Sequence, residues 1–304
     1  MAAPRFMLAA ILAALATLAA CGPTVSSGTV ETSDGATLYY EECGDGSPVI
    51  LLHGHSLDLR MWDEQFESFA RAGHRVVRFD FRGYGKSSEQ SETQQFTHAG
   101  DLVAVMDALG IERAHLVGLS MGGFVGADML GVHPERILSA TLASGNIRRS
   151  PGPSTPMDAE ESARRDAEIA ALRARGVDSM KHEWFEGLMR SAGSQRERMR
   201  EPLRRMIDEW SAWQPLHKEV RVIVGLDAWA MIKEQRPDVP VLLVEGRSEH
   251  NRVNPSPEIL RYLPRGRMVV IDDCGHMLSM ERPEEFGREV LGFIGSVDNQ
   301  SAGD

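Results

Sequence analysis

The chain has 304 residues, of which 42% are hydrophobic and 25% charged, and this composition fits one large α/β domain that carries an insertion. Its formal net charge is −11, and loss of Arg5 with an N-terminal leader would change it to −12 (−11 minus one positive charge). An acidic chain with no polybasic run argues against a nucleic-acid partner and against electrostatic binding to anionic lipid. The ten histidines do not have the spacing of metal ligands, so no metal ion is expected.

Residues 1–21 are predicted to be a bacterial lipoprotein signal peptide. Met7–Ala20 is an uncharged, mostly apolar run of 14 residues, which is short for a transmembrane helix and suits the apolar region of a secretory signal. The run leads into Leu18-Ala19-Ala20-Cys21, which resembles the lipoprotein box, where cleavage leaves the cysteine as a lipidated first residue. The alternative is an ordinary secretory signal with a cysteine beside the cleavage point.

A lipidated Cys21 would anchor the protein to a membrane of the bacterial cell envelope, on the periplasmic or extracytoplasmic face. Gly22 is not the aspartate type of inner-membrane retention signal, which favours the outer membrane. Residues 22–28 are small and polar, and we expect them to form a tether between lipid and folded domain. One lipid chain binds membranes only reversibly, so a firm anchor requires a multiply acylated cysteine.

Alternating strand and helix patterns follow the tether. A hairpin is expected over Thr29–Thr32 and Thr37–Glu42. Six further strands are predicted at Val49–Leu52, Arg75–Phe79, Ala114–Gly118, Leu138–Ala143, Val241–Val244 and Arg267–Ile271. Helical patterns cover Trp62–Ala72, Thr97–Leu109 and Ser120–Leu130, and a last helix begins near Pro283. This alternation predicts a mostly parallel eight-stranded sheet with helices on both faces.

The segment Gly118-Leu119-Ser120-Met121-Gly122 fits the nucleophile-elbow pattern G-x-S-x-G. An apolar strand pattern precedes it and a helical pattern follows it, which is the context that this motif requires. The two glycines suit a turn too tight for neighbouring side chains, and the serine hydroxyl then lies at the positive end of a helix. The alternative is a glycine-rich turn that holds an ordinary surface serine.

A serine needs a base to become a nucleophile, and two further segments supply candidates. His276 follows a predicted strand near the C-terminus, and Glu249 lies three residues after Gly246, which ends another. The order serine, acid, histidine along the chain is that of the α/β-hydrolases. Each of the three residues follows a separate strand, as catalytic loops of an α/β sheet do.

Residues from about 29 to 294 resemble the α/β-hydrolase family. His53-Gly54-His55 resembles the oxyanion loop of the family, and Asp80-Phe81-Arg82-Gly83-Tyr84-Gly85-Lys86-Ser87 resembles its D-x-R-G-x-G-x-S segment. The segments Asp58–Asp63 and Leu109–Ala114 look closest to the branch of 3-oxoadipate enol-lactonases and small serine esterases. A serine at the elbow, instead of an aspartate, argues against haloalkane dehalogenase and epoxide hydrolase chemistry.

The resemblance implies a role for each residue of the site. His276 would take the proton of Ser120, and Glu249 would orient His276 and stabilise its charged form. The backbone N–H groups of His55 and Met121 would form the oxyanion hole. Most relatives have aspartate where this chain has Glu249. Either the loop Arg247–Asn254 sits further back to accommodate the longer side chain, or another carboxylate, such as Asp227, serves as the acid.

The sheet pattern is interrupted over residues 146–233, where the resemblance implies a helical cap. This cap divides the hydrolase core into residues 29–145 and 234–297, and residues 298–304 are expected to be a tail. Tryptophans at helical spacing usually form the core of a cap, but one or two are expected to line a substrate pocket; the candidates are Trp184, Trp210, Trp213 and Trp229.

Cys43 and Cys274 are predicted to be free thiols. In the family, the strands before them lie toward opposite sheet edges, whereas a disulfide requires Cα atoms within roughly 7 Å of each other.

These observations predict a serine hydrolase that cleaves a small carboxylic ester or lactone through an acyl-enzyme. No organic cofactor is expected, because this acyl-enzyme mechanism needs none. One alternative is a cofactor-free perhydrolase that uses the same triad, and another is a non-catalytic ligand-binding lipoprotein. An enol-lactonase role in the breakdown of aromatic compounds conflicts with the leader, because that pathway is normally cytoplasmic. The oligomeric state is left open by the sequence.

Overall fold

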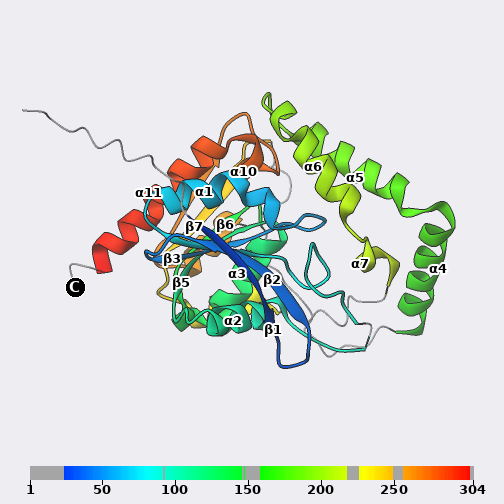
Figure 1. Cartoon of the computed structure of the whole chain (residues 1–304), viewed down its shortest axis with the longest axis horizontal. Coiled ribbons are helices and arrows are strands. Elements are labelled where there is room, and N and C mark those ends of the chain that lie inside the picture. Colours follow the sequence, from blue (N-terminus) through cyan, green and yellow to red (C-terminus); the bar gives the residue numbers. More distant parts are fainter. Residues whose placement is uncertain are drawn as a thin grey trace, which may run out of the picture.

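The computed structural model of the chain describes residues 24–91, 93–145, 147, 158–217, 226–248 and 256–301. Its centre is an eight-stranded sheet with the order β1-β2-β4-β3-β5-β6-β7-β8 (Figure 1). β2 pairs antiparallel with β1 and β4, and all other neighbouring strands are parallel. The strands are β1 (Val25–Glu31), β2 (Thr37–Cys43), β3 (Pro48–Leu52), β4 (Arg75–Phe79), β5 (Ala114–Leu119), β6 (Ile137–Ala143), β7 (Val241–Gly246) and β8 (Gly266–Ile271). The predicted mostly parallel, eight-stranded sheet is confirmed.

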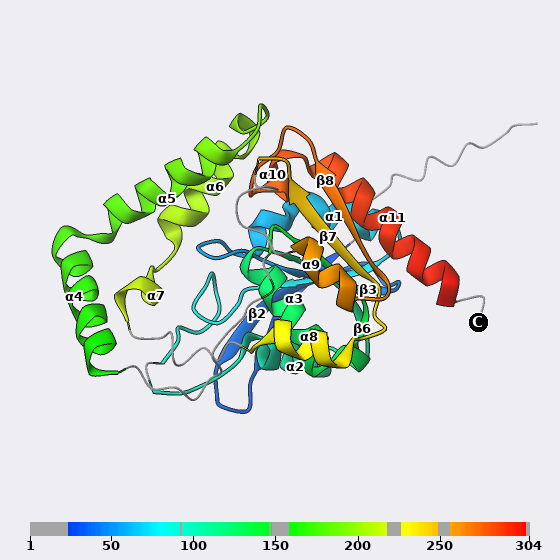
Figure 2. The same cartoon turned by 180° about the vertical axis from the view of Figure 1, so that it is seen from behind.

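Helices cover both faces of this sheet. One face is covered by α1 (Asp63–Arg71) and α11 (Pro283–Ser301), and the other by α2 (His98–Ala108), α3 (Met121–Val132) and α8 (Ala228–Gln235) (Figures 1 and 2). Because both of its faces are covered, β5 is buried at all six of its residues. This explains why the central strands read as continuous apolar runs. Short helices complete the core: η1 (Leu59–Trp62), η2 (Pro134–Arg136), α9 (Ser256–Ile259), η4 (Leu260–Tyr262) and α10 (Leu278–Glu281).

A helical arm follows β6 and forms the cap. It contains α4 (Ala159–Arg175), α5 (Val177–Ser191), α6 (Glu197–Glu209) and α7 (Trp213–Leu216). α5 and α6 lie side by side and project beyond the sheet (Figure 2). The three longer helices bury apolar residues; α6, for example, buries Met199, Leu203, Met206 and Ile207, which recur on one helix face.

The first strand begins earlier than the sequence predicts. The sequence assigns residues 22–28 to a tether, but Val25–Gly28 pair with β2 as the first half of β1. The side chains of Val25, Ser26 and Ser27 are exposed because β1 is the edge strand of the sheet. Backbone pairing, with little apolar burial, therefore holds this segment, and the folded domain begins by Val25 instead of residue 29.

Two boundaries near the other end of the chain also differ. The predicted cap ends at residue 233, whereas α8 packs against α3 in the body of the domain. The predicted tail begins at residue 298, whereas α11 continues to Ser301. Asp298 on this last turn pairs with the buried ring of His115, with 3.0 Å between Oδ1 and Nε2. This contact holds the last turn of α11 against the sheet.

Cys43 and Cys274 are both buried and free, as predicted. Cys43 ends β2, and Cys274 follows β8 at the far edge of the sheet. Within the ranges that the structure describes, no helix is both long enough and apolar enough to span a membrane.

Candidate active site

Ser120 lies in a sharp turn between β5 and α3. Its φ of 54° is in the left-handed region, which is strained for a residue with a side chain. A Cβ atom at Gly118 would lie 2.2 Å from the carbonyl oxygen of Gly122, and a Cβ atom at Gly122 would lie 2.0 Å from that of Leu52. Only glycine fits at these two positions. The turn is thus the strained strand-to-helix elbow that the sequence pattern predicts, with a half-buried serine at its tip.

Backbone hydrogen bonds fix this elbow. The N–H group of Ser120 donates to the carbonyl oxygen of Ala143 at 2.8 Å, and the N–H group of Phe124 donates to that of Ser120 at 3.0 Å. Met121 is the first residue of α3. Because the first N–H groups of a helix have no acceptor within it, the N–H group of Met121 is of the kind that stabilises an anion beside Ser120.

His53 connects the loop after β3 to the loop after β4. The N–H group of Phe81 donates to its Nε2 at 2.9 Å, so Nδ1 carries the ring proton and donates to the carbonyl oxygen of Gly54 at 2.8 Å. Complete burial lowers the pKa of His53 to about 4, which keeps the ring neutral. His53 thus acts as a fixed support for the predicted oxyanion loop.

His55 is the meeting point of this loop and the cap. Its Nδ1 atom lies 2.7 Å from the hydroxyl of Tyr84, and its ring makes edge contacts with Trp210 at 4.9 Å and with Trp184 at 6.2 Å between centroids. Burial, and secondarily the neighbouring His53, lowers the pKa of His55 to about 4. The His55 ring is therefore neutral at physiological pH and lies against aromatic side chains.

Two of the four candidate tryptophans reach this site. Trp184 on α5 donates its indole N–H to the hydroxyl of Ser56 at 2.7 Å, although 42% of the residue is exposed. Trp210, just after α6, is buried. Trp213 stacks on His217 instead, with 4.2 Å between ring centroids. Trp229 lies on α8 and is buried in the apolar cluster on that side of the sheet, so it is not part of the cap.

His276 is half-buried in the loop after β8. The fully buried carboxylate of Glu281 holds this loop by accepting the N–H group of Gly275 at 3.0 and 3.2 Å to its two oxygens. It also accepts the N–H group of Gly193, in the turn between α5 and α6, at 2.7 Å. Burial raises the pKa of Glu281, against the lowering effect of these donors. Glu281 thus joins the histidine loop to the cap.

Glu249 lies outside the residues that the structure describes. The two residues before it are described, and they run beside the histidine loop: the N–H group of Ser248 donates to the carbonyl oxygen of Cys274 at 3.0 Å. A Cβ atom at Gly246 would lie 2.3 Å from the carbonyl oxygen of Gly275. Residues 246–248 therefore lie along the loop that carries His276.

Residues 47–283 of the chain match the family described as the alpha/beta hydrolase fold. The chain belongs to the α/β-hydrolase family. A putative carbamate hydrolase, RutD, of Azorhizobium caulinodans is 27% identical over 276 residues, which are 86% of this chain and 97% of that protein. A non-heme chloroperoxidase of Streptomyces lividans is 27% identical over 286 residues, which are 88% of this chain and 100% of that protein.

The fold is also found among solved structures. Est816, described as an N-acyl homoserine lactone degrading enzyme, is 27% identical and has a TM-score of 0.64, covering 88% of this chain and 100% of its own. The predicted fold and the assignment of this α/β-hydrolase as an enzyme are thus confirmed.

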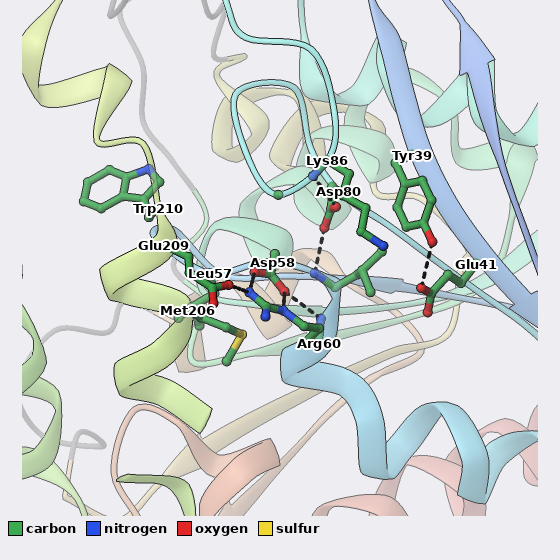
Figure 3. Close-up of a pocket in the computed structure, with 12 residues that line it drawn as sticks. Tyr39, Glu41, Leu57, Asp58, Arg60, Asp80, Lys86, Met206, Glu209 and Trp210 are labelled. Atoms are coloured by element: carbon green, nitrogen blue, oxygen red, sulfur yellow. Dashed lines mark hydrogen bonds and ion pairs between the residues drawn. The ribbon is translucent and has the colours of Figure 1, made fainter. Parts of the chain in front are cut away.

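This α/β-hydrolase has a cavity of about 340 Å³ beside the predicted oxyanion loop (Figure 3). Arg60 bridges its core and cap walls, at 2.6 Å from Asp58 and 2.5 Å from Glu209. Trp210 separates the cavity from His55, since it lines the cavity and packs on the His55 ring. Neither Ser120 nor His276 lines this cavity. The remaining lining residues are Tyr39, Glu41, Leu57, Leu59, Asp80, Gly85, Lys86 and Met206.

Two residues that contact the site were not singled out from the sequence of this α/β-hydrolase. Tyr84 lies inside a segment that marks the family, and Glu281 lies just before the last helix. The pattern D-x-R-G-x-G-x-S indicates a structured loop at Tyr84 but not what its hydroxyl contacts. Glu281 gives no signal beyond its position five residues after His276.

Proposed function

We propose that this chain is a serine hydrolase that cleaves a small carboxylic ester or lactone through an acyl-enzyme on Ser120. The observation that carries the proposal is the strained elbow, where two glycines that admit no side chain place Ser120 at the start of α3. His276 follows β8, which is parallel to β5 and β7 in the same sheet. The carboxyl ends of these strands share one edge, where catalytic loops of such sheets gather.

In the proposed mechanism, Ser120 Oγ attacks the substrate carbonyl carbon while His276 accepts the hydroxyl proton. Glu249 orients His276, and the N–H groups of His55 and Met121 stabilise the oxyanion. The alcohol leaves with the proton from His276, and a water molecule then releases the acid by the reverse sequence. One donor of an oxyanion hole contributes about 2.7–4 kcal/mol to the transition state in other enzymes.

The test combines turnover with covalent labelling. A panel of p-nitrophenyl esters of increasing acyl length, together with several lactones, should reveal hydrolysis by the wild-type protein. Ser120→Ala should lower kcat by about 10⁶, as loss of a comparable nucleophile does. A phosphonate should label Ser120 in the wild type and leave Ser120→Ala unlabelled, as detected by peptide mass spectrometry. Ser296→Ala, on α11, removes another serine hydroxyl and serves as control. Full turnover by Ser120→Ala would refute the proposal.

The similarity to a non-heme chloroperoxidase supports a second candidate on the same site. In perhydrolysis, hydrogen peroxide replaces water as acceptor of the acyl group, so that Ser120 is released and a peracid forms. Water and peroxide compared as acceptors at equal turnover of one ester would separate the two activities. A protein that binds esters without cleaving any of them would instead indicate the ligand-binding lipoprotein.

We also propose that lipid on Cys21 anchors the enzyme to a membrane of the cell envelope. Cys21 and the leader lie outside the described residues, so the proposal rests on the sequence of residues 1–21. Because β1 begins at Val25, only residues 22–24 separate Cys21 from the sheet. The enzyme would therefore be held close to the membrane surface, with the outer membrane favoured by Gly22.

A further inference from the structure

Tyr84 lies between the two residues assigned to the oxyanion hole. Its hydroxyl is 2.7 Å from Nδ1 of His55 and 3.5 Å from Sδ of Met121, and only 4% of the residue is exposed. These three residues follow β4, β3 and β5, which are consecutive neighbours in the sheet. One hydroxyl thus connects two loops and the start of a helix across three strands.

The Tyr84 hydroxyl lies within hydrogen-bond distance of both residues. It is placed to donate to the sulfur of Met121. Its oxygen and Nδ1 of His55 form the shorter contact, in which either atom is able to donate. Burial keeps the His55 ring neutral, so one of its nitrogens carries a proton and the other is an acceptor.

The loop that carries Tyr84 is itself held firmly. A Cβ atom at Gly85, where φ is +53°, would lie 2.2 Å from a carboxylate oxygen of Asp80. The same carboxylate accepts the N–H groups of Lys86 and Leu59, each at 2.8 Å (Figure 3). Leu59 belongs to the segment that follows His55, so Asp80 ties the two loops together independently of Tyr84.

We propose that Tyr84 is a positioning residue that holds both donors of the oxyanion hole. Its hydroxyl fixes the side chains of His55 and Met121, and through them the spacing of their backbone N–H groups. Donors that are held before the reaction need no reorganisation when negative charge develops. This inference rests on the proposed function, since it requires acyl transfer at Ser120.

The decisive variant is Tyr84→Phe, which keeps the ring and removes the hydroxyl. Tyr262→Phe, on η4, is the matched control, because the Tyr262 ring packs against Lys233 and Arg236 at the end of α8 and does not line the cavity beside the oxyanion loop. We expect kcat for p-nitrophenyl butyrate to fall roughly tenfold in Tyr84→Phe, which is less than the ~10²–10³ lost with an entire donor. KM should change less than twofold, and Tyr262→Phe should retain wild-type kcat.

A boronic acid separates positioning from a general structural role. Its tetrahedral adduct with Ser120 places an anionic oxygen at the same donors, so its inhibition constant should rise by about the same factor as kcat falls. Wild-type kcat and wild-type boronate affinity in Tyr84→Phe would overturn the inference. A rise in KM with unchanged kcat would also overturn it, because ground-state binding alone would then depend on the hydroxyl.

Met121→Leu provides an independent test if Tyr84→Phe does not fold. It removes the sulfur acceptor and keeps the backbone N–H group, so kcat should fall by a smaller factor than in Tyr84→Phe, with KM unchanged. Wild-type kcat and boronate affinity in a folded Met121→Leu would overturn the inference. Ser120→Ala distinguishes failure of the proposed function from failure of the role of Tyr84. If Ser120→Ala retains turnover, the proposed function is wrong. If Ser120→Ala is inactive and Tyr84→Phe is fully active, only the role of Tyr84 is wrong.

Discussion

At the scale of single residues, buried carboxylates organise the loops of this site. Glu281 and Asp80 each accept two backbone N–H groups from different segments, and neither is more than 2% exposed. Such a carboxylate satisfies donors that would otherwise be buried without a partner, at the expense of its own desolvation. The raised pKa of each group, which is caused mainly by burial, reflects that desolvation.

Glu281→Gln tests whether the buried carboxylate stabilises the protein by accepting backbone N–H groups of the histidine loop and the cap. The amide replaces one carboxylate oxygen with an NH₂ group, which cannot accept the N–H group of Gly193 or Gly275. We expect unfolding by urea to show a loss of about 1–3 kcal/mol, because a buried donor is left unsatisfied. Glu284→Gln, at an exposed surface ion pair, should change stability by less than about 1 kcal/mol. Equal stabilities of the two variants would contradict the role of Glu281.

Asp80 makes stability depend on pH in a defined direction. Burial raises its pKa to about 7 from the usual 3.8, so the folded state binds the proton more tightly than the unfolded state. Its stabilising contribution is thus present below pH 4 and is lost as pH rises through 7. Asp80→Asn cannot titrate, so the stability of the wild type relative to Asp80→Asn should decrease between pH 4.5 and 7.5, by about 3 kcal/mol. A constant difference across this range, measured by urea unfolding, would show that Asp80 does not titrate there.

At the scale of elements, polar contacts join the cap to the core in addition to the apolar packing of α5 and α6. The indole N–H group of Trp184 on α5 donates a hydrogen bond to the hydroxyl of Ser56. Arg60 of the core forms an ion pair with Glu209 at the end of α6. The N–H group of Gly193 donates to the carboxylate of Glu281. Trp184 and Trp210 place the cap against His55. The position of α5 and α6 therefore decides what covers the oxyanion loop.

Trp184→Phe should weaken this attachment without affecting the reacting groups. Loss of the indole hydrogen bond removes about 1 kcal/mol, so we expect KM to rise about fivefold while kcat stays within twofold. Trp213→Phe is the matched comparison, because Trp213 stacks on His217 within the cap and should give a smaller change. Steady-state kinetics on one ester measures KM and kcat of both variants. A larger rise in KM for Trp213→Phe than for Trp184→Phe would contradict the role of Trp184 in attaching the cap.

The elements that the sequence predicts well are those with a strong local pattern. The last six strands agree with prediction to within two residues at each end, because buried parallel strands are continuous apolar runs. Residues 25–28 were missed because an exposed edge strand needs only backbone pairing. The end of the cap was misplaced because the amphipathic pattern of α8 does not reveal which surface it covers.

In the candidate site, too, the residues with a strong local sequence pattern are the ones that the sequence predicts. Ser120 is recognisable because the elbow is a local turn with strict demands on its neighbours, and His276 because it follows an apolar strand. The contacts of Tyr84 and Glu281 join segments that are distant in the chain, so no short pattern specifies them.

At the scale of the whole molecule, the two thiols of the core are kept apart by the sheet. Cys43 ends the second strand in the sheet order and Cys274 follows the last, six strand positions away. At about 4.8 Å per strand this is far beyond the roughly 7 Å that a disulfide permits between Cα atoms. Both thiols are buried, and burial raises the pKa of each, which suppresses the reactive thiolate.

This arrangement makes a count of free thiols a test of the lipid anchor. The native protein should react only slowly with a thiol reagent, because neither Cys43 nor Cys274 is accessible. After unfolding, protein extracted from bacterial membranes should show two thiols if Cys21 is blocked by lipid and three if it is not. Cys21→Ser should also show two, but as an unlipidated precursor that does not enter the detergent phase. Three thiols in the wild-type membrane fraction would exclude lipidation of Cys21, and none would indicate that Cys43 and Cys274 pair after all.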